Sequence, residues 1–342
     1  MTVLRELRRL AGRTPLTALA VAASTALLLS ACGGGTSQVQ AFKPDRMLAF
    51  GDENSVIVDA TDSSGNHDGF KYTINDRTAT TGLKCTATPI FTQSVAGLYG
   101  FSFAECREAA TAIKAYTLAK VDAKVGDAVS GLAQQMAEVQ TATGKALGSG
   151  DLVTVLIGAN DMLALYAEVK AGTRTSAEAR TEAKARGALA AARINEILGT
   201  GARALVITLP DMGLSPYALT EETTRPGAVA LLSQMSYDYN AEMRTRIDAT
   251  AYDGRNYGLV LADDIVSAIA RYPSAYLSSP AVANVAACDA TLAPTVTQCT
   301  TTTLVSGASS SSHLWADATH LGPEGHSRIA SQAQSRALNN PF

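Results

Sequence analysis

The segment from Asp151 to Ile157 (DLVTVLI) is an almost continuous apolar run that ends at Gly158. A run without alternation of polar and apolar residues is typical of a strand buried on both faces of a parallel sheet. Shorter apolar runs indicate further strands at 46–50, 204–209 and 258–262. Helices are expected between these strands, at 176–198 and 228–251. The alternation predicts an α/β fold, a three-layer sandwich in which helices cover both faces of a mostly parallel, flavodoxin-like central sheet of about five strands.

The other segments have weaker patterns. Further helices are expected at 105–116, 121–143 and 323–338. Two polar stretches indicate loops, at 61–88, which also contains a small hairpin, and at 273–313. Because ligands of open parallel sheets gather at the carboxyl ends of the strands, functional residues are expected directly after the strands.

Residues 1–31 have the layout of a secretory signal, in which arginines precede an uncharged run rich in Ala and Leu. The run is too short and too weakly apolar for a membrane span. It ends in Leu-Ser-Ala-Cys32, which resembles a bacterial lipobox. The resemblance implies that Cys32 carries a lipid that anchors the exported protein to a membrane of the bacterial cell envelope, facing the periplasm or the cell surface. Residues 32–44 would then be a flexible tether and residues 45–342 a single domain; an ordinary cleaved signal peptide is the alternative.

The charge of the chain argues against a nucleic-acid partner. Without residues 1–31 the chain has 24 basic and 30 acidic residues, so the mature protein is mildly acidic. Binding to phosphates requires clustered Lys and Arg, and the sequence has no such cluster.

The cysteine content fits an exported protein. If Cys32 carries lipid, four cysteines remain, which is an even number in a compartment where disulfides persist. Of the three possible connectivities we expect Cys85 with Cys106 and Cys288 with Cys299, because each pair closes a short loop. A zinc site is the poorer alternative, since no Cys-x-x-Cys spacing is present.

Polar clusters follow two of the expected strands, and a third cluster lies near the C-terminus. They are GDENS at 51–55, GAND at 158–161 and DATHL at 317–321. Each cluster alone is compatible with a helix cap or a turn. Their joint order predicts that all three lie at one edge of the sheet.

These clusters and their surroundings resemble the SGNH or GDSL hydrolase family, in particular its secreted lipase, phospholipase and haemolysin-like branch, over nearly the whole mature chain. The matching stretches are AFGD at 49–52, DLVTVLIGAND at 151–161, TLPDMGLSP at 208–216, Asn240, LVLAD at 259–263 and HLWADATHLGPEGHSRIA at 313–330. The resemblance implies a carboxylic ester hydrolase with no metal or organic cofactor. It further implies that His320 is the general base, that Asp317 orients it and that Asn160 helps to bind the oxyanion.

The nucleophile position departs from the family pattern. Where relatives have Gly-Asp-Ser, this chain has Glu53, and the nearest hydroxyl belongs to Ser55, two positions later. The alignment places the Glu53 carboxylate, rather than the Ser55 hydroxyl, toward His320, where it would favour the protonated imidazole. Relatives also often have a glycine that supplies an oxyanion N–H where this chain has YTLAKV at 116–121, which leaves Gly100 as the fallback candidate.

Three explanations of the altered nucleophile remain open at this stage. Ser55 attacks from a shifted turn, Glu53 is the reactive carboxylate beside His320, or the protein is an inactive relative that binds an acyl or glycan ligand. The substrate of an active enzyme would be a lipid, a short acyl ester or an acetylated glycan. The loops at 60–110 and 273–313 would select among them.

Overall fold

In the computed structural model the chain divides into two units, residues 1–40 and 41–342. The structure describes residues 42–60, 68–78, 82–107, 112–252 and 256–339. The expected signal segment and Cys32 lie outside the described residues. Within the described ranges, no helix has both the length and the apolar character needed to cross a membrane.

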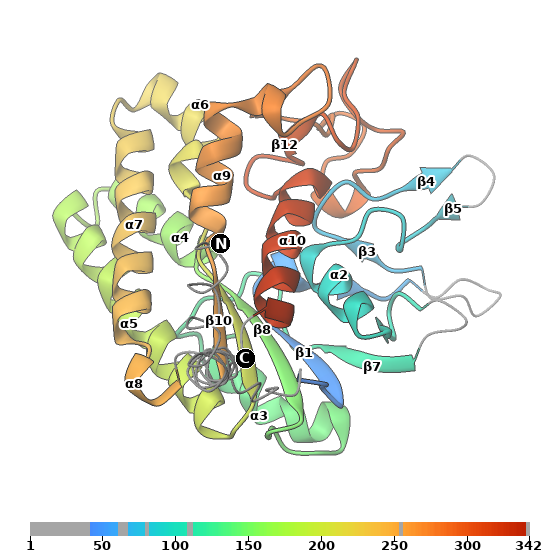
Figure 1. Ribbon diagram of the computed structural model, residues 1–342. Helices are drawn as coiled ribbons and strands as arrows, with labels where there is room; N and C mark the ends of the chain where they lie inside the picture. Colours follow the sequence, from blue (N-terminus) through green and yellow to red (C-terminus); the bar gives the residue numbers. More distant parts are fainter. Residues whose placement is uncertain (1–41, 61–67, 79–81, 108–111, 253–255, 340–342) are drawn as a thin grey trace, which may run out of the picture. The chain divides into compact units, whose positions relative to one another are not determined.

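A parallel sheet of six strands forms the centre of the second unit (Figure 1). In spatial order the strands are β10 (Tyr257–Val260), β9 (Arg203–Ile207), β8 (Asp151–Leu156), β1 (Arg46–Gly51), β7 (Ala112–Thr117) and β6 (Phe101–Phe103). Each neighbouring pair in this sheet is parallel. The carboxyl ends of these strands therefore lie at one edge, which is where polar side chains from separate loops can meet.

Helices cover both faces of the sheet, as Figure 1 shows. One face packs against α3 (Leu132–Thr143), α4 (Ala159–Lys170), α5 (Ser176–Gly199) and α7 (Ala228–Arg246). The other face packs against α2 (Phe91–Leu98), α9 (Ala262–Arg271) and α10 (Pro323–Asn339). Successive residues of a strand alternate between the two cores: in β1, Leu48 and Phe50 face the first core, and Met47 and Ala49 the second. Both faces are apolar, which explains the unbroken apolar runs in the sequence.

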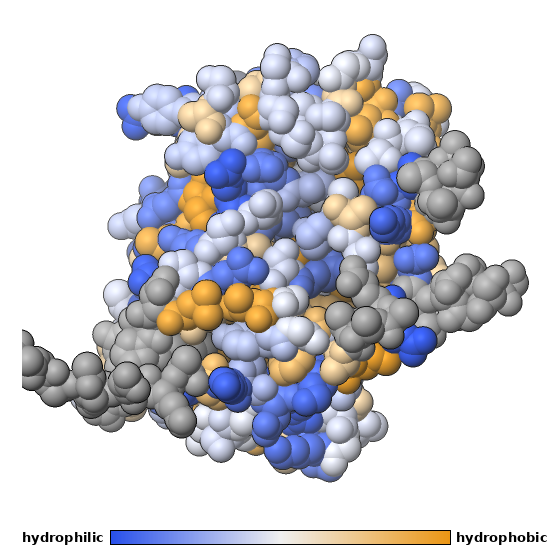
Figure 2. Space-filling view, turned by 45° about the vertical axis from the view of Figure 1, so that its right-hand side comes forward, coloured by the Kyte–Doolittle hydropathy of each residue, from blue (hydrophilic) through white to orange (hydrophobic). Residues whose placement is uncertain are grey.

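Short elements complete the domain at the edges of the sheet. The helical ones are α6 (Pro216–Thr224), α8 (Ala249–Tyr252) and the 3₁₀ turns η1 (Glu53–Ser55), η2 (Met212–Leu214), η3 (Pro273–Ala275) and η4 (Val296–Gln298). The strand pairs are β2 (Ile57–Val58) with β3 (Phe70–Lys71), β4 (Arg77–Thr78) with β5 (Gly82–Leu83), and β11 (Val282–Ala286) with β12 (His313–Trp315). On the face drawn in Figure 2, apolar residues form separate patches among polar ones.

The expected α/β sandwich with a mostly parallel sheet is confirmed, with two local corrections. The segment 105–116 was expected to be helical, but its second half forms β7, because pairing with β1 and β6 overrides the helical preference of an Ala-rich stretch. This strand and β6 join the four strands located from the sequence, so the sheet has six strands where about five were expected. The helix expected from residue 121 begins only at Leu132, because Asp161 holds the preceding loop through the backbone N–H of Val125.

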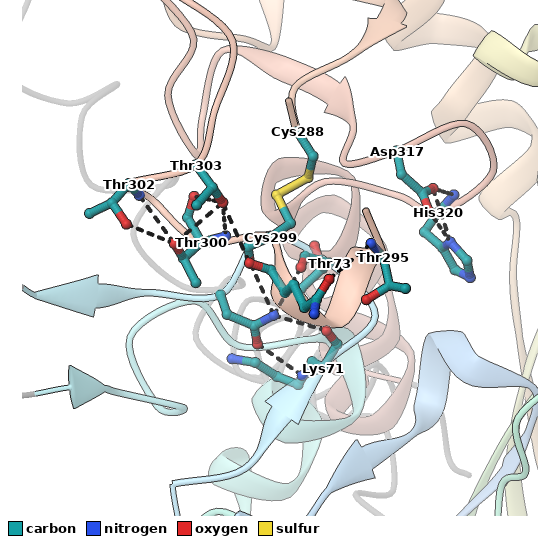
Figure 3. Close-up of a disulfide and its surroundings, with 12 residues drawn as sticks. Lys71, Thr73, Cys288, Thr295, Cys299, Thr300, Thr302, Thr303, Asp317 and His320 are labelled. Carbon is teal, nitrogen blue, oxygen red and sulfur yellow. Dashed lines mark hydrogen bonds and ion pairs between the residues drawn. A yellow bond between two sulfur atoms is a disulfide. The ribbon is translucent and has the colours of Figure 1, made fainter. Parts of the chain in front are cut away.

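Two disulfides are present, Cys85–Cys106 and Cys288–Cys299, which are the two sequence-local pairs. The second pair closes part of the long segment between α9 and α10, beside the Asp317–His320 turn (Figure 3). Residues 273–313 of this segment were expected to be a loop, but they contain β11, which pairs in parallel with β12 at their C-terminal end.

Candidate active site

The candidate site lies at the carboxyl edge of the sheet, where β1 runs into the 3₁₀ turn η1 and β8 runs into α4. Asp52 caps η1: its Oδ1 accepts hydrogen bonds from the backbone N–H and the side-chain amide of Asn54. A short polar side chain at this position satisfies an otherwise free N–H of the turn. The cap orients the first residue of the turn, Glu53, toward the site.

Gly51 fixes the direction of the chain as it leaves β1. Its φ angle is +132°, and a Cβ there would lie 1.8 Å from the carbonyl oxygen of Leu156 on the neighbouring strand, so only glycine fits. The side chain of Gln135 in α3 clamps the same residue, since it accepts from the Gly51 N–H and donates to the Gly51 carbonyl, both at 2.8 Å. The turn that presents Glu53 is therefore held from both sides.

The Glu53 carboxylate contacts two of the predicted site residues. Its Oε1 lies 3.6 Å from Nε2 of His320, and its Oε2 accepts a hydrogen bond of 2.8 Å from Nδ2 of Asn160. Glu53 is buried, with 7% of its surface exposed. A carboxylate thus occupies the place from which a nucleophile would meet the histidine.

His320 is held from its other side by Asp317 (Figure 3). Its Nδ1 lies 2.9 Å from both carboxylate oxygens of Asp317. Asp317 Oδ1 also accepts the backbone N–H of His320 at 2.7 Å and that of Thr319 at 2.9 Å, so the carboxylate organises the whole turn. A hydrogen bond at Nδ1 leaves Nε2 facing Glu53, which is the orientation that proton transfer at Nε2 requires.

The two carboxylates change the protonation of the histidine. Burial alone would lower the pKa of His320, but the hydrogen bonds and charges of Asp317 and Glu53 outweigh it and raise the pKa to about 10. Burial likewise opposes ionisation of Glu53, yet the hydrogen bonds from His320 and Asn160 lower its pKa overall. At neutral pH the site therefore contains an imidazolium between two carboxylates.

Asp52, the residue before Glu53 in the chain, is completely buried. Burial, followed by the adjacent charge of Glu53, raises the pKa of Asp52 to about 7. The buried turn therefore keeps Asp52 only partly ionised at neutral pH while Glu53 is fully ionised.

Asn160 owes its position to the start of α4. The helix follows Gly158, whose φ angle is +128° and where a Cβ would lie 2.8 Å from the ring of Tyr239. The hydroxyl of Tyr239 donates to the carbonyl of Ile157 at 2.8 Å. The second hydrogen-bond partner of the Asn160 amide is the carbonyl of Ala123, at 3.3 Å, in the loop after β7.

Two predicted site residues do not reach this cluster. The Ser55 side chain is fully buried, and its hydroxyl has no hydrogen-bond partner among the described residues. Gly100 precedes β6 and thus lies at the amino edge of the parallel sheet, opposite the edge that carries Asn160. The topology therefore separates Gly100 from the oxyanion position for which it was the fallback.

The structure adds residues that the sequence did not reveal. Tyr72 comes from the segment expected to be a loop, and its ring centroid lies 5.6 Å from that of His320. His326 is fully buried and stacked on Phe91. Burial lowers the pKa of His326 to about 3, so this imidazole is neutral. His326 lies in α10, one face of which packs on the sheet.

The arrangement has the parts of an acid–base site. An oriented histidine, a carboxylate within 3.6 Å of it and an amide donor converge on one point. Among the described residues, no group of three or more His, Cys, Asp or Glu side chains could hold a metal ion.

The chain is similar to a protein family and to several solved structures. No curated protein sequence matches the chain. Among solved structures, an α/β-hydrolase enzyme from the metagenome of Lake Arreo, Spain, is similar with 14% identity and a TM-score of 0.38, over 87% of this chain and 97% of that one. The family model described as GDSL-like lipase/acylhydrolase matches residues 47–333. The chain therefore belongs to the GDSL-like lipase/acylhydrolase family.

Proposed function

We propose that the protein is a carboxylic ester hydrolase whose natural turnover is low. Membership of the family supports hydrolysis of the esterase or lipase type. The observation that carries the proposal is the convergence of His320, Asp317 and Asn160 on residue 53. The low turnover follows from Glu53, which holds His320 in its protonated form.

A route through Glu53 uses the protonation states of this site. Water attacks the ester carbonyl while Glu53 takes its proton, and the amide of Asn160 donates to the developing oxyanion. The tetrahedral adduct then collapses: the bond to the alcohol oxygen breaks, and the imidazolium of His320 protonates that oxygen. The proton on Glu53 returns to His320 and restores the starting state. The lowered pKa of Glu53 makes it a weak base, which limits the rate.

Direct attack by Glu53 on the ester is the less favourable variant of this route. It would form a mixed anhydride between Glu53 and the acyl group, which is higher in energy than the ester itself. We therefore assign Glu53 to the activation of water. The buried Ser55 hydroxyl has no part in the route, since it has no hydrogen-bond partner among the described residues and thus none in His320.

A second candidate function is the binding of an acyl or glycan ligand without turnover. The observation that favours it is the hydrogen bond from Asn160 to Glu53, which occupies the oxyanion donor in the resting site. The weaker bond from the same amide to the Ala123 carbonyl, at 3.3 Å, leaves one N–H easier to redirect toward a substrate. For this reason hydrolysis is the preferred proposal.

The test is the hydrolysis of p-nitrophenyl butyrate by the purified natural protein and by Glu53→Gln. Glutamine keeps the shape of the side chain but cannot accept a proton from water, so kcat/KM should fall about 100-fold. A natural protein that does not exceed the rate without enzyme would refute hydrolysis and favour the binding function. An unchanged kcat/KM in Glu53→Gln would refute the route through Glu53.

We also propose that the protein acts in the bacterial cell envelope. The basic and apolar residues 1–31 support export, and the Leu-Ser-Ala-Cys32 ending supports a lipid anchor on Cys32. Its partners would then be the membrane, through this anchor, and a small-molecule or lipid ester. The two disulfides agree with an oxidising compartment.

A further inference from the structure

A cavity of about 730 Å³ lies beside the candidate active site. One wall is α6, and the other walls are β11, part of the segment closed by the disulfide Cys288–Cys299, and the turn that begins at Asp317. Its volume lies within the range of about 300–1,000 Å³ that is typical of small-molecule sites. The cavity is thus large enough to receive part of a substrate.

The lining of this cavity is mainly apolar. The apolar residues include Pro216, Leu219, Val285, Ala293, Pro294 and Val296. Val285 is 50% exposed, so a substantial apolar surface at the cavity is in contact with water. Covering such a surface with a hydrocarbon chain is favourable.

Hydrogen bonds fix the walls to the catalytic turn. The backbone N–H of Tyr217, in the first turn of α6, donates to the carbonyl of Ala318 at 2.9 Å. The N–H of Cys288 donates to the carbonyl of Ala316 at 2.8 Å, on the other side of Asp317. Asp317 and Ala318 themselves line the cavity. A ligand in the cavity therefore ends at the turn that carries His320.

The disulfide shapes the wall opposite α6. Five lining residues lie between the two cysteines and belong to the loop that the disulfide closes: Ala290, Ala293, Pro294, Thr295 and Val296. Figure 3 shows Thr295 in this loop, together with the disulfide, Asp317 and His320. A covalent closure limits the conformations of the loop and keeps this wall in place.

We propose that this cavity binds the hydrocarbon chain of the substrate and thereby selects medium-chain esters over acetates. The proposal rests on the proposed ester hydrolysis and adds the substrate class. The chain could belong to the acyl part or to the alcohol part of the ester, and both present the same apolar chemistry to the cavity. The ester end of the ligand would lie at the Asp317 and Ala318 end of the cavity, next to the turn that carries His320.

Two matched variants on α6 test the cavity. Thr220 lines it and Thr224, one turn further on, does not; both hydroxyls donate to carbonyls of their own helix, so the two replacements lose the same kind of bond. Thr220→Trp should fill the cavity, whereas Thr224→Trp should leave it open. The background is the full chain with Cys32→Ser, which keeps the proposed lipid off the protein.

The first measurement is the binding of 1-octanol by titration calorimetry, which does not depend on turnover. We expect the affinity for 1-octanol to fall at least tenfold in Thr220→Trp and to stay unchanged in Thr224→Trp. Equal affinities in all three proteins would overturn the cavity as the binding site. If binding follows the expectation but no ester is hydrolysed, the cavity assignment stands and the proposed hydrolysis fails.

The second measurement compares kcat/KM for methyl octanoate, octyl acetate and methyl acetate. If the cavity binds the acyl chain, Thr220→Trp should lower the ratio of methyl octanoate to methyl acetate at least tenfold. If it binds the alcohol chain, the ratio of octyl acetate to methyl acetate should fall instead. A Thr220→Trp protein in which neither ratio changes would contradict the proposal, provided that the natural protein hydrolyses these esters.

Discussion

Replacing Glu53 with serine should increase ester hydrolysis, and the structure sets the size of the effect. With a pKa of about 10, His320 is neutral in roughly one molecule in 300 at pH 7.5. At its ordinary pKa of 6.5 it would be neutral in about nine molecules in ten. Asp317 still holds the imidazole in the variant, so its pKa should fall only part of the way. The fraction of molecules in which His320 is neutral, and can therefore act as a base, should rise by a factor between about 10 and 300.

The assay is kcat/KM for p-nitrophenyl butyrate at pH 7.5, together with an NMR titration of His320. Glu53→Ser should show a lower pKa of His320 and a kcat/KM at least tenfold above that of the natural protein. Glu53→Ala is the matched control: it removes the same charge and lowers the same pKa but offers no nucleophile, so its kcat/KM should not rise. A comparison of Glu53→Ser with Glu53→Ala therefore separates the effect of the new hydroxyl from the effect of the lowered pKa of His320.

Two results would refute this reasoning. If Ser55→Ala abolished a robust natural activity, Ser55 would be the nucleophile despite its burial. If the pKa of His320 were the same in the natural protein and in both variants at position 53, the contact of 3.6 Å between Glu53 and His320 would not control protonation. The first result would contradict the proposed low turnover itself, and the second would remove its proposed cause.

Three further predictions concern stability and location. Replacing Cys288 and Cys299 together with serine should lower the free energy of unfolding by about 3 kcal/mol in a urea titration, because the disulfide closes a short loop; an unchanged midpoint would contradict this. The pKa of His326 is about 3 in the folded state and 6.5 in the unfolded one, so the unfolded state binds the extra proton and stability is lost as the pH falls from 6.5 toward 3. Between pH 6 and 4 the free energy of unfolding should fall less steeply in His326→Phe than in the natural protein, by about 1.4 kcal/mol per pH unit. If the two proteins gave parallel curves of unfolding free energy against pH, His326 would not be the group responsible. Cys32→Ser should move the protein from the membrane fraction to the soluble fraction after cell lysis, and continued membrane retention would rule out the lipid anchor.

The sequence predicted the central strands well because their patterns are set by burial. The run at 151–157 is apolar on both sides since both faces of β8 are covered, and its neighbours in the sheet show the same pattern. At β7 the prediction failed, because the N-terminal half of this strand is exposed and therefore lacks the apolar run that marks the central strands. Pairing with β1, more than 60 residues away in sequence, determines its conformation, and local patterns do not contain such information.

The site was predictable where a motif stands next to a strand end. The GAND cluster lies directly after β8, where the alternation of strands and helices places it, and the Asp317–His320 turn was located by its resemblance to the family motif. Tyr72 and the Ala123 carbonyl escaped prediction, because they reach the site through long loops whose course depends on tertiary contacts. Gly100 was assigned to the wrong edge of the sheet, since the strand that follows it had not been recognised.

The hydrogen bonds that hold the loops around the site do not depend on the side chain at position 53. Gln135 holds the backbone of Gly51, Asn240 holds both the N–H and the carbonyl of Leu209 in the neighbouring loop, and Asp317 organises its own turn. None of these bonds involves the Glu53 side chain, so a change at this position leaves the framework in place. What changes is the charge next to His320, and with it the proton that the imidazole carries at neutral pH. In the proposed assignment, the carboxylate of Glu53 thus converts a site built around a neutral base into one that starts from an imidazolium, and Glu53→Ser tests this assignment directly.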